Sequence, residues 1–177
     1  MGSRPRTPAT PVEGTIVFTD IVGFTDFTAT RGDAEALQLL AVQDRLVQAV
    51  LPDGARIVKE IGDGLLLWFP EPASALHSAF DLHRGFEAES EATGLPLWIR
   101  VGMHHGRALR RGDDVIGHDV NVAARIVGVA APGEVLVSDA VHAGVDPGAG
   151  HASFTELGPV VMKGIPQPIR LWRATAC

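Results

Sequence analysis

A β-hairpin is predicted by the sequence RIVKEIGDGLLLWF at residues 56–69. Residues 56–61 and 65–69 look like two short strands, and Gly62-Asp63-Gly64 joins them tightly. Two such segments separated by a short, glycine-containing connection are a strong hairpin signal. The same connection places an acidic side chain, Asp63, at the tight turn between two strands.

Helical and strand patterns alternate on both sides of this hairpin. Strands are expected at residues 14–18 and 97–103, where apolar and β-branched residues run together. The helix before the hairpin is expected to begin at the N-cap Asp33 and to end near Gly54. The order β-α-β-β-α-β predicts an α/β (α+β) fold with a ferredoxin-like split βαβ core. The predicted inward-facing helix residues are Leu37, Leu40, Ala41, Asp44 and Val47 before the hairpin, and Leu76, Phe80 and Leu82 within residues 73–89 after it.

The remaining elements are expected to extend this core within one domain. One compact domain usually takes roughly 100–200 residues, so residues 14–177 are assigned to a single domain. Residues 1–13 are rich in Pro, Thr and Arg and are expected to form a flexible arm. The C-terminal elements are a hairpin at 107–116, a helix at 119–129, a strand at 133–137, a loop at 143–152 and strands at 155–161 and 169–173.

The composition excludes several classes of function. The 177 residues carry 15 Lys and Arg against 21 Asp and Glu, and a net charge of −6 argues against a nucleic-acid partner. The single cysteine, Cys177, permits neither an intrachain disulfide nor a thiolate zinc site, which suits a cytoplasmic location. No apolar run approaches the roughly 18–20 residues of a membrane span, so no direct membrane insertion is expected. The chain could still be the cytosolic part of a larger protein.

Two carboxylates stand where acidic side chains are structurally unfavourable. Asp20 directly follows an apolar strand, and Asp63 occupies the hairpin turn. These elements are central neighbours in a split βαβ sheet, so the two side chains are expected to converge at one end of it. Paired carboxylates in oxygen-only surroundings suit Mg²⁺ or Mn²⁺, and a phosphate substrate would complete the shell. The alternative is structural, with Asp20 capping a helix and Asp63 filling a turn.

Five segments, in this order and at this spacing, resemble the motifs of class III nucleotidyl cyclases. The resemblance runs from about Gly14 to Arg173 and implies the class III cyclase fold. The short segment between Gly106 and Gly117 is similar to that of the short-arm bacterial subgroup. The segments FTDIVGFT (18–25) and KEIGD (59–63) resemble the two metal-binding motifs, the second of which also carries a base-selecting lysine. The segment RVGMH (100–104) resembles the strand with a triphosphate-binding arginine. The other two matching segments are DVIGHDVNVAAR (114–125) and KGI (163–165).

The resemblance implies an adenylyl cyclase that makes 3′,5′-cyclic AMP and pyrophosphate from ATP. Asp20 and Asp63, with the main-chain carbonyl of Ile21, would hold two divalent cations, Mg²⁺ or Mn²⁺. One cation would activate the ribose 3′-hydroxyl, and the other would neutralise the pyrophosphate leaving group. Asp20 is a candidate acceptor of the hydroxyl proton.

Lys59 and Asp114 are expected to select the base. Adenine presents an acceptor at N1 and a donor at N6, which an ammonium and a carboxylate match. Guanine presents the reverse pattern and would leave both side chains facing the wrong partners. The pair therefore predicts ATP over GTP. The structural alternatives are a solvated strand-edge lysine and a turn aspartate.

The resemblance assigns four further residues to the ribose and phosphates. Asn121 and Arg125 are four residues apart and share one helix face, where they would orient the ribose and meet charge on the α-phosphate. An exposed polar stripe is the alternative for this pair. Arg100 lies in an apolar strand and, with Lys163, would bind the β- and γ-phosphates.

A head-to-tail homodimer with two shared sites is implied, because in this family one subunit supplies the metal aspartates and the other supplies the base-selecting and transition-state residues. Two other functions stay open. A non-catalytic, nucleotide-binding regulatory homologue usually lacks catalytic positions that are present here. A guanylyl cyclase is disfavoured by Lys59 and Asp114.

A histidine pair, His104-His105, is the remaining feature with possible chemistry. It could indicate a metal site. With no third ligand evident nearby in the sequence, a polar pair at a strand end is the favoured interpretation.

Overall fold

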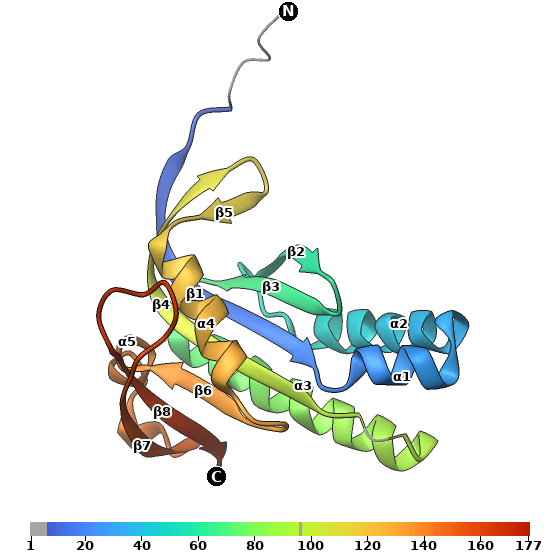
Figure 1. The fold of residues 1–177 in the computed structure, drawn as a ribbon. Helices are drawn as coiled ribbons and strands as arrows, with labels where there is room; N and C mark the ends of the chain where they lie inside the picture. The colour runs from blue at the N-terminus through green and yellow to red at the C-terminus, as the bar shows by residue number, and fades with distance from the viewer. Residues whose placement is uncertain (1–6, 96) are drawn as a thin grey trace, which may run out of the picture.

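The computed structural model describes residues 7–95 and 97–177. Its centre is an eight-stranded sheet in the order β2-β3-β1-β4-β6-β8-β7, with β5 paired to β4 off this path. Helices cover both faces of the sheet (Figure 1). The elements are β1 Thr10–Ile21, α1 Phe24–Arg31, α2 Asp33–Val50, β2 Arg56–Ile61, β3 Gly64–Phe69, α3 Pro72–Thr93, β4 Ile99–Arg111, β5 Asp114–Ile116, α4 His118–Val129, β6 Val135–Ser138, α5 Asp139–Ala143, a 3-10 turn Pro147–Ala149, β7 Ala152–Val160 and β8 Ile169–Ala176.

The split βαβ core predicted from the sequence is confirmed. The predicted hairpin forms as β2 and β3, and β1 lies between β3 and β4, antiparallel to both. Val17 of β1 pairs with Leu67 on one side and Met103 on the other. Strand β6 then adds in parallel to β4, and β8 and β7 follow as an antiparallel pair. Asp20 therefore lies at the end of a strand in the middle of the sheet.

One sheet face, here called the α2–α3 face, is covered by α2 and α3. Period-two alternation along the strands sends Val17, Leu67 and Met103 to this face, where they join the largest apolar cluster. Phe86 of α3 and Val47 of α2 are almost completely buried in the same cluster. Among the described residues, no helix is both long and apolar enough to cross a lipid bilayer.

The opposite face, here called the α4 face, carries only α4 and two smaller apolar clusters. Figure 1 shows α4 running across this face over β4. The helix backbone lies so close to the sheet that a Cβ at Gly102 would collide with the backbone of Val127. Glycine is therefore required at this crossing. Arg100 and His104, which alternate with the core residues of β4, point to this face with Asp20.

The first strand begins at Thr10, not at Gly14 as predicted. The last four residues of the predicted arm, 10–13, pair with 107–110 of β4. Pro11 argued against a strand here. It is tolerated because β3 pairs with β1 only from Thr15 onward, which leaves this part of β1 with an open edge. Strand β4 is correspondingly continuous through Arg111, where a strand and a separate hairpin were predicted.

The helix before the hairpin differs from the prediction in its start and its phase. Gly32, at φ +89°, separates a short helix α1 from α2, and Gly32 rather than Asp33 is the N-cap. The buried residues of α2 are Ala36, Leu39, Gln43 and Val47, whereas Leu37 is 67% exposed. The predicted and the true face share Val47 and each contains one polar residue, Asp44 and Gln43 respectively, so the apolar periodicity did not distinguish them. Helix α5 ends where the expected loop at 143–152 begins, and the 3-10 turn lies within that loop.

Candidate active site

The two predicted metal ligands lie together at one end of the sheet. Asp20 is at the end of β1, and Asp63 is in the turn between β2 and β3. The turn packs closely against β1, because a Cβ atom added at Gly64 would lie only 2.6 Å from the carbonyl oxygen of Thr19. Burial, and next the negative charge of Asp20, raise the pKa of Asp63 above its ordinary value. Two carboxylates that repel each other in this way form a site that favours a cation.

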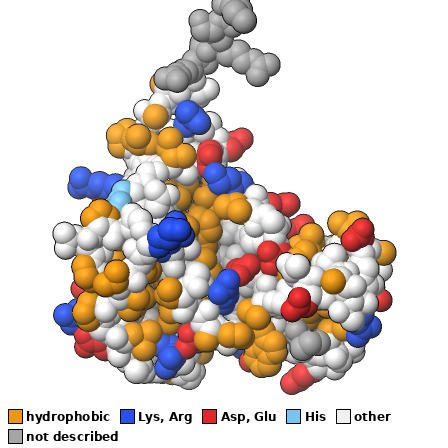
Figure 2. Space-filling view, in the orientation of Figure 1, with side chains coloured by type: hydrophobic (Ala, Val, Ile, Leu, Met, Phe, Trp, Pro, Cys, Tyr) orange, Lys and Arg blue, Asp and Glu red, His pale blue; other side chains and the backbone are white. Residues whose placement is uncertain are grey.

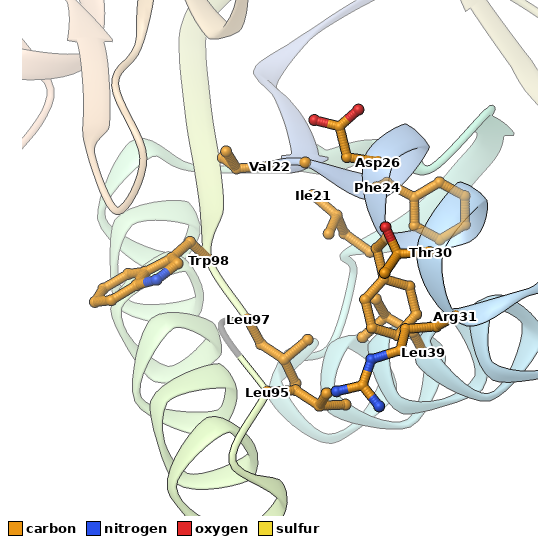
Figure 3. Close-up of a pocket in the computed structure, with 12 residues that line it drawn as sticks. Ile21, Val22, Phe24, Asp26, Thr30, Arg31, Leu39, Leu95, Leu97 and Trp98 are labelled. Carbon is orange, nitrogen blue, oxygen red and sulfur yellow. The ribbon is translucent and has the colours of Figure 1, made fainter.

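The donor set fits a hard divalent cation better than a transition metal. Within the described part of the chain, no three His, Cys, Asp or Glu side chains are placed to hold a metal ion. Two carboxylates that leave the other ligand positions to water or phosphate are typical of Mg²⁺ sites. The Ile21 side chain is buried and lines an apolar hollow of about 470 Å³ beside α1 (Figure 3). Only its main-chain carbonyl can offer oxygen to a cation.

That hollow contains none of the other predicted site residues. Phe24, Leu39, Leu97 and Trp98 form much of its wall, as Figure 3 shows. An apolar wall of this kind suits apolar groups and does not suit a triphosphate. The candidate site is therefore on the α4 face.

Arg100 contacts Asp20 directly. The two residues are register partners in β1 and β4, and Nε and Nη2 of Arg100 lie 2.8 and 2.6 Å from the same oxygen, Oδ2 of Asp20. Nη1 lies 3.5 Å from the carbonyl oxygens of Gly128 and Ala130 at the C-terminal end of α4. Asp20 is thus the anionic partner of a partly buried arginine for which the resemblance implied phosphate oxygens.

The predicted base-selecting pair is also brought together. Nζ of Lys59 in β2 lies 2.9 Å from Oδ1 of Asp114 in β5 and 3.1 Å from Oδ2. The hydrogen bond from Lys59 is the main cause that holds the pKa of Asp114 below its ordinary value. Both side chains remain partly exposed, at 43% and 35%, so a ligand can reach them.

Helix α4 presents Asn121 and Arg125 on one exposed stripe. Its opposite side buries Val122, Ala123 and Ile126 against the sheet. Lys163, in the segment between β7 and β8, lies near this stripe. In residues 7–95 and 97–177, no carboxylate is within salt-bridge distance of Arg125 or Lys163. Two cations without an acidic partner favour an anionic ligand.

Two grooves on the α4 face connect these residues. The first, about 420 Å³, is lined by Asp20, Lys59 and Asn121, with Ile61 and Val127 among its apolar neighbours. The second, about 410 Å³, is lined by Asn121, Arg125 and Lys163. Asn121 borders both grooves. Figure 2 shows acidic and basic side chains gathered around a hollow on this face.

The sequence did not reveal what His104 does. His104 and His105 point to opposite faces: Nδ1 of His105 contacts Oγ1 of Thr15 at 2.9 Å, whereas Nδ1 of His104 contacts Oγ of Ser138 at 2.7 Å. Nε2 of His104 lies 3.4 Å from Oδ1 of Asp119. The pair is not a metal site. The pair was expected at a strand end, but β4 continues to Arg111, so both histidines lie within the strand. The partners of His104 come from distant segments.

Comparison with known proteins identifies the family. The model of the adenylate and guanylate cyclase catalytic domain matches residues 9–173. The pH-sensitive adenylate cyclase MT1302 of Mycobacterium tuberculosis is 33% identical over 161 residues, which cover 90% of this chain and 40% of that protein. The chain thus spans about two fifths of this relative's length.

Solved structures share the fold. The adenylate/guanylate cyclase/hydrolase from Silicibacter pomeroyi is 28% identical, with a TM-score of 0.81 over 96% of this chain and 100% of that one. An adenylate cyclase structure from Trypanosoma brucei, described in its monomeric state, has a TM-score of 0.81 over 97% and 92% of the two chains at 23% identity. The chain therefore belongs to the family of class III adenylyl and guanylyl cyclase catalytic domains.

Proposed function

We propose that this chain is an adenylyl cyclase domain that converts ATP into 3′,5′-cyclic AMP and pyrophosphate at sites shared between two copies. The observation that carries the proposal is that one groove of about 420 Å³ is lined by Asp20, Lys59 and Asn121, from three different elements. A single copy thus presents, along one groove, a carboxylate for a cation together with an ammonium for a base and an amide for a ribose. In a head-to-tail pair, Asp20 of each copy would serve one site while its Lys59 and Asn121 serve the other, so each site would be completed across the interface.

Asp20 and Asp63, with the carbonyl of Ile21, would hold two Mg²⁺ or Mn²⁺ ions, which supply positive charge beside the 3′-hydroxyl and the triphosphate. Burial, and next the charge of Asp20, raise the pKa of Asp63, and this supports the assignment because a cation beside the two carboxylates offsets both effects. Asp20 is the candidate acceptor of the hydroxyl proton, since it is the carboxylate at the end of the groove-lining strand.

Lys59 and Asp114 would read the base. Nζ of Lys59 donates to adenine N1, and the Asp114 carboxylate accepts from the N6 amino group. The two side chains already lie together, and a partly exposed ion pair opens at a cost of only about 0–1 kcal/mol. Guanine would face both with the wrong donor and acceptor, and this mismatch supports ATP as the substrate.

Asn121 would orient the ribose, and Arg125, one turn further along α4, would stabilise the charge that grows on the α-phosphate. Lys163 and Arg100 would bind the β- and γ-phosphates. Arg100 is already held beside the carboxylate that takes the cation, so it would meet the phosphates next to Asp20. Phosphoryl transfer requires mainly positioning and charge stabilisation, and these residues supply both.

Exposed apolar side chains near the site support its completion by a second copy. Ile61, next to the Asp63 turn, is 48% exposed, and Val129, at the end of α4, is also 48% exposed. Val161, two residues before Lys163, is 81% exposed. A head-to-tail pair related by a two-fold axis would cover these residues and form two equivalent sites.

The test is an assay of the purified chain with Mn²⁺ and either ATP or GTP over a range of protein concentrations. The expected product is cyclic AMP from ATP, with a specific activity that rises with protein concentration. Cyclic GMP from GTP as the main product would contradict the base assignment. Tight ATP binding without any cyclic product at high concentration would favour the regulatory homologue instead.

A further inference from the structure

A series of polar side-chain contacts links three elements of the α4 face. Oγ of Ser138, at the end of β6, lies 2.7 Å from Nδ1 of His104 in the middle of β4. Nε2 of His104 lies 3.4 Å from Oδ1 of Asp119 in the first turn of α4. The other carboxylate oxygen, Oδ2, accepts the backbone N–H of Arg107 at 2.7 Å.

The proton positions along the Ser138–His104–Asp119 contacts follow from the groups whose role as donor or acceptor is fixed. Burial lowers the pKa of His104 against the opposing effect of Asp119, and the nearby His105 and His118 add to the lowering. The imidazole is therefore neutral at pH 7. The Asp119 carboxylate can only accept, so its position beside Nε2 favours the Nε2–H tautomer, in which Nδ1 accepts from the Ser138 hydroxyl. Ser138 is only 1% exposed, which excludes a hydrolytic Ser-His-Asp centre.

Besides the apolar packing of Val122, Ala123 and Ile126, close contacts at both ends hold α4 on β4. Near its C-terminal end, the helix backbone rests on Gly102. At its start, the Asp119 carboxylate fills the space over Gly106, where a Cβ would collide with it. These end contacts limit how far the helix can shift or turn on the sheet, and the His104–Asp119 contact belongs to the end that precedes Asn121. Asn121 follows Asp119 by two residues, and Arg125 follows one turn later.

We propose that His104 is a positioning residue that acts through Asp119 to place Asn121 and Arg125 for the reaction. The inference rests on the proposed function, because it concerns the two α4 residues of that site. Lys59 and Asp114 are on β2 and β5, so loss of the His104 contact leaves base recognition intact. A shift of α4 then lowers kcat and does not raise KM for ATP. Small misplacements of catalytic groups are known to have large kinetic effects.

The test compares two substitutions of similar polarity. The amide nitrogen in His104→Gln reaches the position of Nε2 and still donates to Asp119, whereas the shorter side chain in His104→Asn reaches only toward Ser138. We expect His104→Asn to lower kcat about tenfold or more, and His104→Gln to stay within about threefold of the wild type. His105→Asn is the matched control, since His105 faces Thr15 on the other side of the strand. KM and the ATP-to-GTP ratio stay unchanged in all three.

A second measurement does not depend on turnover. Nitrogen-15 NMR of histidine is expected to show the Nε2–H tautomer of His104 in the wild type. In Asp119→Asn, the backbone N–H of Arg107 fixes the amide oxygen, so the amide nitrogen faces His104 and the tautomer changes to Nδ1–H. The side-chain amide resonance of Asn121 is expected to move in His104→Asn and not in His105→Asn.

The possible outcomes separate this inference from the proposed function. Equal kcat in the two His104 variants, an effect on KM alone, or an unchanged tautomer in Asp119→Asn would overturn the positioning role. A wild-type chain without cyclase activity contradicts the proposed function instead. In that case, the tautomer and the Asn121 resonance still decide whether His104 positions α4.

Discussion

The two faces of the sheet differ in how completely they are covered. The α2–α3 face holds the largest apolar cluster, with Phe69, Phe86 and Val47 almost fully buried. The α4 face has one helix, two smaller clusters and two open grooves, and it carries Asp20, Asn121 and the residues around them. From this comparison we expect the first face to supply most of the stability and the second to carry the proposed chemistry.

The largest effect is expected from a substitution on the α4 face, which should lower activity strongly without lowering stability. Asp63→Asn should lower cyclic AMP formation on the order of 1000-fold, because one of two cation-binding carboxylates is removed. Its thermal unfolding midpoint should equal or exceed that of the wild type, since the charge repulsion with Asp20 is relieved. Asp53→Asn, in an exposed turn, is the control. A lower midpoint in Asp63→Asn would show that this face also carries stability.

The opposite result is expected on the α2–α3 face. Phe86→Ala removes a side chain that is 1% exposed and should lower the free energy of unfolding by about 3–5 kcal/mol. Urea unfolding measures this change. Activity per folded molecule, assayed at low temperature, should remain close to that of the wild type. A large loss of turnover in fully folded Phe86→Ala would break the division between the faces.

Acid sensitivity is also expected to arise from the helices of the α2–α3 face. Burial lowers the pKa of His83, on α3, to about 4, and its Nε2 has no hydrogen-bond partner among the residues that the structure describes. The unfolded chain takes up this proton near pH 6.5, so stability is present above that pH and is lost as the pH falls toward 4. The loss should reach about 3 kcal/mol, by 1.36 kcal/mol per pKa unit. His83→Leu should flatten the urea-unfolding stability between pH 7 and 4.5, and an unchanged slope would contradict the assignment.

A smaller effect is expected for base selection. Lys59→Met removes a hydrogen bond from a charged donor, worth about 1.5–3 kcal/mol, and should lower kcat/KM for ATP by about 10- to 150-fold. The ratio of ATP to GTP turnover should fall, because the donor to adenine N1 is removed and only Asp114 remains to distinguish the two bases. Stability should change by less than about 1 kcal/mol, since the pair is partly exposed. An unchanged nucleotide ratio would remove Lys59 from base recognition.

The sequence predicted the features that depend on local pattern and missed those that depend on register. The β2–β3 hairpin, the split βαβ order and the meeting of Asp20 with Asp63 followed from turn chemistry and apolar runs. The pairing of Asp20 with Arg100 depends on the register of two strands 80 residues apart, which no local pattern reveals. The phase of α2 was wrong because the predicted and the true face each contain one polar residue, Asp44 and Gln43, and the apolar periodicity does not distinguish them.

His104 shows the same limit within the site. Strand alternation separates it from His105, but its partners, Ser138 and Asp119, come from a later strand and a helix. Residues whose partners are brought together only by the tertiary fold are the ones that sequence reasoning leaves without a role.

The most direct test of the shared site is complementation between two inactive chains. Asp63→Asn keeps a complete α4 stripe, and Asn121→Ala keeps both carboxylates, so a heterodimer regains one intact site. Random pairing gives half heterodimers with one working site of two, so an equimolar mixture should recover up to about a quarter of the wild-type activity. Cyclic AMP formation is measured for each variant alone and for the mixture, at a protein concentration where the wild type is fully active. Recovery supports the shared site, and a mixture no more active than its components would contradict it.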